Sequence, residues 1–484
     1  MPMRRTTWVL ALSGLLLAGC VQGHVYYEKG NQLVEKRQWE PALQEYNQAI
    51  AADSRLTGAY LKRGLCFQRL GRYDEALADY NQAVALAPGN DQSYINRALF
   101  YDEQGDHRQL ALNDLGKALE LNKNSAYAYN LRGNVYLKLL QFENAILDYT
   151  ESIRINPRDY TPHCGRGDAY LELRDFPKAI ENYDQAIEID NKQALPFSGR
   201  GFAHLELGRC KEAFADCQRA VELDPHLGAS YLRRGYVYIR CDGDYKKGIA
   251  DYTKAIELEP KYFYAFHARG DAYQEIGELK KALADYDEAL KLNPAYAPSW
   301  LSRGSLHIKL GNADRGLADL DKGAELLAKS PHAQAARGYG YHLAGRHKES
   351  LAAYNRAIQL DPKLGAAYHG RGFVHLSLGR EDLAMQDYDK ALILDPKLRY
   401  AYTARASVKM SQKKYSSALQ DYNKAIQLEP GFAAAYLARA DLHRLRGQAK
   451  LAIADYRSAL KNGEQIPEVS KPARQALQEL GAKP

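Results

Sequence analysis

Several motifs that carry chemistry are missing from this chain of 484 residues. Its six cysteines include no C-x-x-C pair, which removes support for a zinc finger or a thioredoxin-like redox centre. The sequence also lacks a glycine-rich phosphate loop, a G-x-S-x-G elbow and an H-E-x-x-H helix. We therefore expect no metal site, no cofactor and no enzymatic activity.

Long apolar runs and a strong net charge are missing as well. After Leu17 no apolar run approaches the roughly 20 residues that a membrane-spanning helix needs. The formal net charge is only +7. So weak a field over so long a chain does not favour nucleic acid as a partner.

The N-terminus has the pattern of an export signal. Arg4 and Arg5 precede an apolar stretch that ends in Leu-Ala-Gly-Cys. This ending resembles the lipobox of bacterial lipoproteins, in which the cysteine is acylated and becomes the mature N-terminus. The resemblance implies a signal peptide at residues 1–19 and lipidation of Cys20.

The same resemblance implies a location in the cell envelope. Cys20 is followed by Val21 rather than Asp, which in that family directs a lipoprotein to the outer membrane, facing the periplasm. The polar helical pattern opens at Tyr26. Residues 20–25 are therefore expected to form a short lipidated tether.

Tyrosine outnumbers phenylalanine by 36 to 11, which indicates a recurring position suited to an aromatic ring with one wet end. A small residue, called position 8 below, recurs every 34 residues in all but two steps. A period of this size is typical of stacked repeats that cannot bury an apolar face alone. Its thirteen members are Gly30, Gly64, Ala98, Gly133, Gly167, Gly201, Gly235, Gly270, Gly304, Gly338, Gly372, Ala406 and Ala440.

Other positions of the repeat are equally regular. Position 4 is aromatic in eleven repeats, position 20 is small, position 24 is usually Tyr, and position 32 is Pro in eight repeats. The spacings 4-8-11 and 20-24-27 follow the helical period, and proline ends a helix. Each repeat is therefore predicted to form two helices joined by a tight turn.

This order of aromatic, small, Tyr, Ala and Pro residues resembles the tetratricopeptide repeat. The resemblance covers residues 23–466 and implies an all-α, right-handed superhelical solenoid of about 13 helix-turn-helix units. The first helix of each unit would line a concave groove. No linker rich in Pro or Ser interrupts the array, so one continuous solenoid is expected. In residues 467–484, a helix that starts at Ser470-Lys471-Pro472 is expected to cap the solenoid before a short tail.

Position 7 departs from the family pattern, since it is usually apolar there but is Arg in twelve of these thirteen repeats. Position 23 is Asp in ten. An arginine ladder that binds anions is one interpretation, and structural Arg–Asp pairs within or between repeats are the other. We favour the pairs because the one repeat with Lys29 at position 7 also carries the one Glu at position 23, Glu45.

The predicted structural pairs include Arg63 with Asp79, Arg132 with Asp148, and Arg405 with Asp421. Two arginines have no Asp at position 23 of their own repeat. They are Arg166 and Arg337, and they are expected to be free for another role.

In tetratricopeptide repeats the groove is lined mainly by positions 2, 5, 9, 12 and 13 of the first helix. Here these positions mix aromatic and polar residues, which suits an extended peptide or an amphipathic helix. Packing of the aromatics against the neighbouring hairpin is the alternative. No repeat has Lys at position 5, so the carboxylate clamp of chaperone-binding repeats is not expected. The candidate groove residues are Asn134, Asp168, Phe202, Tyr236, Tyr264, His267, Asp271, Tyr339, His369, Phe373 and Tyr400.

Two further features leave alternatives open. Cys210 and Cys241 fall near hairpin tips of neighbouring repeats, where they could form a disulfide or remain free thiols. The repeat around Gly323–Gln334 is the weakest, with Gly316 and Gly323 at positions 20 and 27, and is either a hinge or ordinary sequence drift. The histidines at position 11 are expected to replace Tyr in the core, since they are too far apart in the array to share an ion.

These resemblances imply a lipid-anchored scaffold that gathers protein partners at the bacterial cell envelope. The alternative is a fixed structural component of an envelope apparatus that secretes or exports polysaccharide, pilus or protein. An enzyme would need a catalytic module outside the repeats, where fewer than 50 residues remain.

Overall fold

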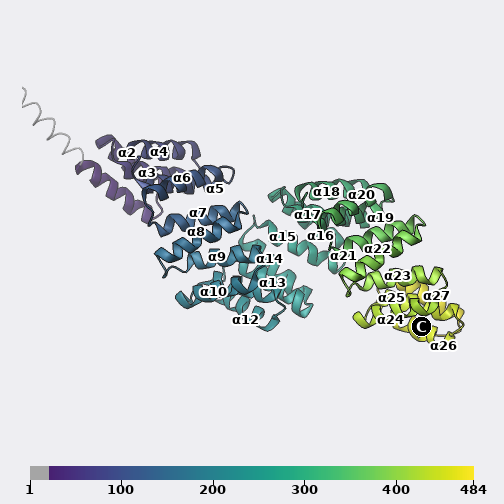
Figure 1. Cartoon of the computed structure of the whole chain (residues 1–484). Helices are drawn as coiled ribbons and strands as arrows, with labels where there is room; N and C mark the ends of the chain where they lie inside the picture. The colour runs from purple at the N-terminus through teal and green to yellow at the C-terminus, as the bar shows by residue number, and fades with distance from the viewer. Residues whose placement is uncertain (1–20, 484) are drawn as a thin grey trace, which may run out of the picture. The chain divides into compact units, whose positions relative to one another are not determined.

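The computed structural model describes residues 21–483, and every regular element in that range is an α-helix (Figure 1). The predicted signal peptide and Cys20 lie outside the described residues. Successive helices pack in pairs as hairpins, and each hairpin packs on the next one within its part of the chain. The predicted all-α solenoid of about thirteen helical hairpins is confirmed. Along residues 21–483 no helix combines the length and the apolar character that crossing a membrane requires.

The chain divides into two compact parts, Met1–Leu258 and Glu259–Pro484, which are called the first and the second block below. The boundary follows the seventh hairpin, where the sequence predicts a continuous solenoid. The 34-residue pattern runs through this boundary without a break, so the pattern alone does not reveal it. The candidate hinge around Gly323–Gln334 lies inside the second block.

Seven hairpins belong to the described part of the first block. Residues 21–35 are helical, so residues 21–25 of the expected tether are already part of the first helix. The other helices are α2 (Trp39–Ala52), α3 (Thr57–Arg69), α4 (Tyr73–Leu86), α5 (Asp91–Glu103), α6 (Arg108–Leu121), α7 (Ala126–Lys138), α8 (Phe142–Ile155), α9 (Thr161–Glu172), α10 (Phe176–Ile189), α11 (Ala194–Glu206), α12 (Cys210–Leu223), α13 (Gly228–Asp242) and α14 (Tyr245–Leu258).

Six hairpins and one additional helix belong to the described part of the second block. They are α15 (Phe263–Glu275), α16 (Leu279–Leu292), α17 (Ala297–Lys309), α18 (Ala313–Leu326), α19 (Pro331–Leu343), α20 (His347–Leu360), α21 (Gly365–Ser377), α22 (Glu381–Leu394), α23 (Arg399–Ser411), α24 (Tyr415–Leu428), α25 (Ala433–Leu445), α26 (Ala449–Gly463) and α27 (Pro467–Glu479).

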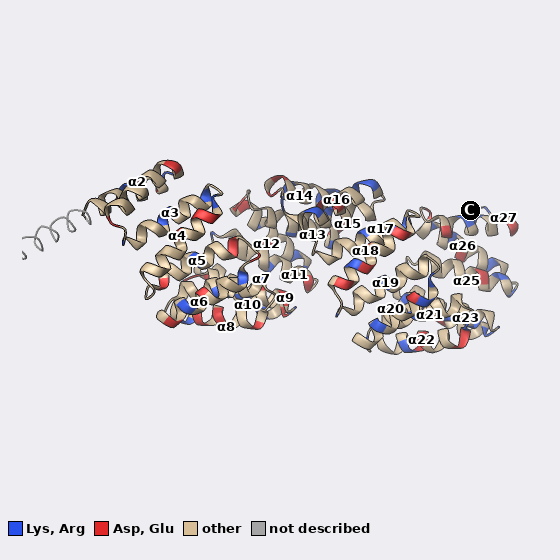
Figure 2. Ribbon diagram, turned by 90° about the horizontal axis from the view of Figure 1, so that it is seen from above, with Lys and Arg blue, Asp and Glu red and all other residues tan. Residues whose placement is uncertain are grey.

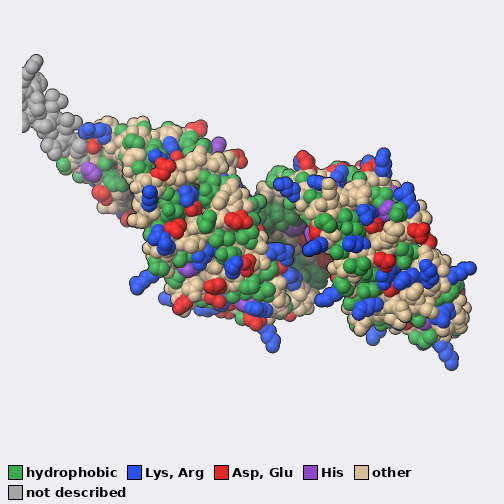
Figure 3. Space-filling view, in the orientation of Figure 1, with side chains coloured by type: hydrophobic (Ala, Val, Ile, Leu, Met, Phe, Trp, Pro, Cys, Tyr) green, Lys and Arg blue, Asp and Glu red, His purple; other side chains and the backbone are tan. Residues whose placement is uncertain are grey.

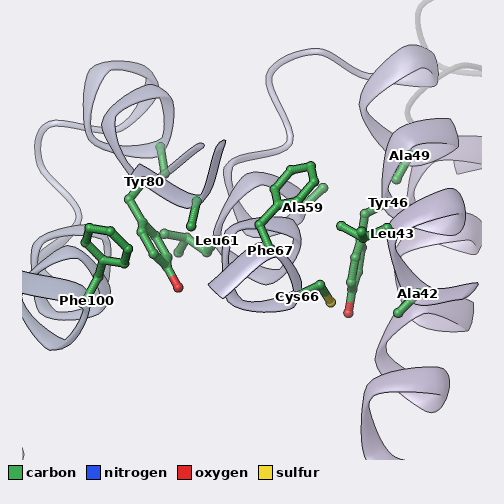
Figure 4. Close-up of a cluster of buried hydrophobic side chains, with 12 residues drawn as sticks. Ala42, Leu43, Tyr46, Ala49, Ala59, Leu61, Cys66, Phe67, Tyr80 and Phe100 are labelled. Atoms are coloured by element: carbon green, nitrogen blue, oxygen red, sulfur yellow. The ribbon is translucent and has the colours of Figure 1, made fainter. Parts of the chain in front are cut away.

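Tyrosine at position 24 explains the small residue at position 8. In the fourth hairpin Tyr149 is fully buried, and a Cβ added to Gly133 would lie 2.7 Å from its ring. The alanines at positions 20 and 27 are also buried, which lets the two helices approach closely. Figure 4 shows the same arrangement at the start of the chain, where Tyr46 lies between Ala42 and Ala49 on one side and Cys66 on the other.

The hairpin turn uses a residue with positive φ. Gly71 and Gly208 take φ of 76° and 72°, a region that costs glycine no steric strain. Repeats without this glycine still make the turn, for example with Leu140 at φ 58°. The turn is thus imposed by the packing of the two helices it joins.

The weak repeat is held by tight packing. A Cβ on Gly316 would lie 2.6 Å from the carbonyl oxygen of Gly304, and one on Gly323 would lie 2.7 Å from the Leu301 side chain. These glycines therefore allow α17 and α18 to approach. The structure gives them a packing role, which neither a hinge nor drift would require.

The helix α27 caps the second block, as expected, but begins at Pro467 rather than Ser470. Pro472 therefore lies inside the helix. Val469, Ala473 and Leu477 are buried against the last hairpin, α25 and α26. The additional turn at the start of the helix brings Val469 into this core. The sequence pattern did not predict this, because it begins only at Ala473.

Candidate protein-binding surface

The arginine at position 7 links the first helix of its repeat to the second helix of the same repeat and to the second helix of the preceding repeat. Nε and Nη2 of Arg303 donate to the two carboxylate oxygens of Asp319 at 2.7 and 2.9 Å. Its Nη1 donates to Asp287, in the preceding repeat, at 2.7 Å. A bidentate pair of this kind fixes geometry as well as charge. The same Arg–Asp pair occurs in all ten repeats that have Asp at position 23.

The three pairs named from the sequence have this geometry. The N–O distances are 2.7 Å for Arg63–Asp79, 2.6 Å for Arg132–Asp148 and 2.8 Å for Arg405–Asp421. The aspartates are buried. Hydrogen bonds from Arg405 to Asp421 raise the pKa of Arg405, which keeps it charged. These arginines are therefore engaged within the protein, which leaves no ladder of free cations for an anion.

The two arginines expected to be free are engaged as well. Arg166 donates to the Asn182 side chain at 2.6 Å and to Thr150 at 3.1 Å. Arg337 pairs with Asp321 of the preceding repeat at 2.6 Å. Thr150 and Asp321 both lie at position 25 of the preceding repeat. The sequence pattern did not indicate that this position would supply acceptors.

Three polar candidates for the groove also serve the core. The buried hydroxyls of position 24 donate to side chains at position 9 of the same repeat. The pairs are Tyr149 with Asn134 at 2.7 Å, Tyr183 with Asp168 at 2.6 Å and Tyr286 with Asp271 at 2.6 Å. Burial raises the pKa of Asp168. The pairing of a Tyr at position 24 with an acceptor at position 9 is the signal in the sequence that could have predicted this role.

The candidate histidines are only partly available at the surface. His267 is buried, with Nδ1 3.1 Å from the Ser299 hydroxyl and Nε2 3.4 Å from Asp271, which corrects its assignment to the groove surface. Its neighbours in the next repeat cover it. His369 is half-buried against the ring of Tyr388, and burial lowers the pKa of His369 to about 4.

The aromatic candidates fall into two groups. Phe202 and Tyr236 are half-buried and contact each other at a centroid distance of 6.1 Å, so for them the packing interpretation holds. The others are exposed: Tyr264 by 43%, Tyr339 by 50%, Phe373 by 42% and Tyr400 by 48%. All four lie on first helices of the second block, where they leave apolar surface in contact with solvent.

Cys210 and Cys241 form a disulfide, with their Cα atoms 5.8 Å apart. The bond joins the start of α12 to the end of α13. It borders a pocket of about 440 Å³ that is also lined by Phe214, Tyr238 and Lys247. The other described cysteines, Cys66, Cys164 and Cys217, are free and buried.

Three position 11 histidines, His204, His375 and His443, lie 3.8–4.0 Å from the buried aspartates of the Arg–Asp pairs. Burial lowers the pKa of His204. Within residues 21–483, no group of three or more His, Cys, Asp or Glu is placed to hold a metal ion.

Several solved structures match this chain. The crystal structure of the APC/C hetero-tetramer Cut9-Hcn1 has a TM-score of 0.57 and 15% identity, and the match covers 94% of this chain and 96% of that one. A tetratricopeptide repeat protein from Parabacteroides merdae has a TM-score of 0.44 and 24% identity, over 54% and 98% of the two chains. Yeast Tom70 has a TM-score of 0.42 and 17% identity, over 94% and 99%. At these identities the first comparison supports the fold alone.

Family models for this repeat match along most of the chain. Models described as TPR repeat match residues 167–208, 270–311 and 338–379. Models described as tetratricopeptide repeat match residues 58–90, 126–159, 228–262, 251–284, 365–398 and 403–467. No curated protein matches the sequence significantly. The matches together cover more than half of the chain, and it belongs to the tetratricopeptide-repeat family.

Proposed function

We propose that this protein is a lipid-anchored adaptor that gathers protein partners at the bacterial cell envelope, on the periplasmic side of the outer membrane. Repeats of this family form scaffolds for protein–protein interaction, and enzymatic activity is not part of the proposal. One observation carries it. Tyr339, Phe373 and Tyr400 lie on the first helices of three consecutive repeats and stay exposed, whereas the tyrosines at position 24 are buried in the core.

The lipid anchor in this proposal rests on the sequence Leu-Ala-Gly-Cys at residues 17–20. The first helix is already formed at residue 21. An acyl group on Cys20 would therefore hold the first block directly against the membrane, without a flexible spacer. Fractionation of cells that express Cys20→Ala tests this, since the variant should leave the membrane fraction. A variant that stays membrane-bound would refute the anchor.

The adaptor role is tested by capturing partners from solubilised envelopes with the parent and with a Tyr339→Ala/Phe373→Ala variant. The variant should lose partners. Tyr73→Ala is the matched control, because Tyr73 is equally exposed but lies at the start of a second helix. Equal capture by all three proteins would refute the role of this surface. A stoichiometric complex that survives detergent would favour the alternative, a fixed component of a secretion or export apparatus.

A further inference from the structure

The inner face of three consecutive repeats contains no charged side chain. We define this face by positions 2, 5, 6, 9, 12 and 13 of α19, α21 and α23, and each of these residues is at least partly exposed. The neighbouring first helices contact each other, so their faces form one surface. Its residues are His332, Ala335, Ala336, Tyr339, His342, Leu343, Ala366, His369, Gly370, Phe373, Leu376, Ser377, Tyr400, Thr403, Ala404, Ser407, Met410 and Ser411.

Apolar groups are prominent on this neutral face. Tyr339 and Leu343, one helical turn apart on α19, are each half exposed. On the next first helix the Phe373 ring packs at a tilt against the His342 ring, at a centroid distance of 4.8 Å. Aromatic side chains in such clusters are the usual anchors of protein interfaces. The face itself offers no Lys, Arg, Asp or Glu side chain to pair with a buried charge, so a ligand that presents uncharged side chains suits it best.

The edge of this face is basic where the hairpins turn. The residues that precede the second helices of the same three repeats are Arg346, Arg380 and Lys414, and none of them caps its helix with a side-chain hydrogen bond. Cations at helix N-termini oppose the helix dipole, so these positions lower stability unless an anion approaches. Of the acidic residues that follow them, Glu349 pairs with Arg346 and Glu381 accepts from Ser411 and Gln412, while Asp382 in the first turn of α22 is exposed.

The positive edge belongs to a positive block. The second block has 34 Lys and Arg against 25 Asp and Glu, a formal net charge of +9. Residues 21–258 of the first block have 30 against 34, a net charge of −4. Figures 2 and 3 show Lys and Arg spread over the second block. A partner with acidic residues would be attracted to the second block before contact.

We propose that the inner face of α19, α21 and α23 binds an acidic amphipathic segment of a partner protein. Apolar and aromatic side chains of the segment contact Tyr339, Leu343 and Phe373. Its Asp and Glu side chains lie at the edge, near Arg380 and Lys414. This inference rests on the proposed adaptor function and specifies the chemistry of the partner.

The test is selection of a displayed library of random 16-residue peptides on the full chain. Selected peptides should combine apolar residues with an excess of Asp and Glu. Tyr339→Ala/Phe373→Ala should weaken their binding by about tenfold or more, because exposed interface aromatics contribute on the order of 1 kcal/mol each. Arg380→Glu/Lys414→Glu should weaken it by about tenfold and favour basic peptides instead.

The matched control is Arg72→Glu/Arg209→Glu, which changes two arginines at the same repeat position in the first block. Binding by this control should stay within about twofold of the parent, since screened distant charges contribute little. Selected peptides without acidic enrichment, or peptides whose binding the second-block variants do not change, would overturn this inference and leave the adaptor function standing. A library from which no peptide is enriched would overturn both.

Discussion

The two blocks are built from one repeat but differ in charge and in cross-links. Both use the bidentate Arg–Asp pair, as Arg200–Asp216 and Arg303–Asp319 show. Only the first block contains cysteine among the described residues, and it carries a net negative charge against +9 in the second. Shared core positions therefore maintain the fold, while the exposed positions are free to differ.

The difference is clearest at position 13 of the first helices. In the first block it carries Arg69, Lys138 and Arg240, which pair with acidic residues of neighbouring repeats. In the second block Leu343, Ser377 and Ser411 occupy the same position. The inner face thus carries ion pairs on these first-block helices and is neutral on α19, α21 and α23, while α15 and α17 of the second block keep Glu275 and Lys309 at position 13. The same helices can present two different surfaces because these positions do not contribute to the core.

The largest expected effect tests what the blocks share. Asp216→Ala in the first block and Asp319→Ala in the second should each lower the free energy of unfolding of their own block by up to about 3–5 kcal/mol, because a half-buried arginine loses its buried carboxylate partner. The controls are Asp184→Ala and Asp287→Ala, which remove the second acceptor of the same arginines. The side chains of Asp184 and Asp287 are 49% and 61% exposed, whereas those of Asp216 and Asp319 are each 10% exposed. They should cost less than about 1 kcal/mol. Hydrogen exchange resolved by block measures both, and equal effects of the buried and exposed acids would contradict the role of the pair.

Reduction of the disulfide should destabilise the first block and leave the second block unchanged. Breaking the Cys210–Cys241 bond, whose cysteines are 31 residues apart, should lower the free energy of unfolding of the first block by about 2–4 kcal/mol. The second block has no cysteine, so its melting temperature should not respond. Calorimetry with and without reductant gives the comparison. A Cys210→Ser/Cys241→Ser variant should no longer respond, and a reductant effect that persists in it would argue against the bond.

Acid should weaken the second block through His369. Burial holds the pKa of His369 at about 4, below the 6.5 of an exposed histidine. Between these values the unfolded chain binds the proton more readily, so the stabilisation present above pH 6.5 is lost as the pH falls toward 4. The loss should be about 2 kcal/mol after allowing for partial exposure. His369→Gln should reduce this acid dependence in the second block and leave the first block as an internal reference; an unchanged pH profile would count against it.

The smallest effect concerns glycines in second helices. Gly116 in α6 of the first block has open space where a Cβ would lie, so Gly116→Ala should stabilise that block by about 0.5–1 kcal/mol. Gly316 in α18 of the second block packs against the backbone of Gly304, so Gly316→Ala should destabilise. Urea unfolding of both variants measures the difference. Stabilisation by Gly316→Ala would show that this repeat is loose.

Much of the site could be predicted only in part. The Arg–Asp pairs follow from two positions that vary together, but their second acceptor at position 25 varies among Asn, Asp, Gln and Thr and leaves no clear pattern. The sequence could not predict that Tyr339 is exposed and Tyr236 is half-buried, because both are tyrosines at position 9. Their neighbours decide the outcome, since Tyr236 packs on Phe202 and Tyr252.

The sequence by itself determined the repeat, the helical hairpin and the capped end, because a 34-residue period with helical spacing admits one way to bury its apolar face. It also determined which cysteines could meet. Tertiary structure decided the division after Leu258, the burial of His267 and the double role of Asp168 and Asp271. These depend on which side chain of one repeat covers which position of the next, a contact between residues that local periodicity does not encode.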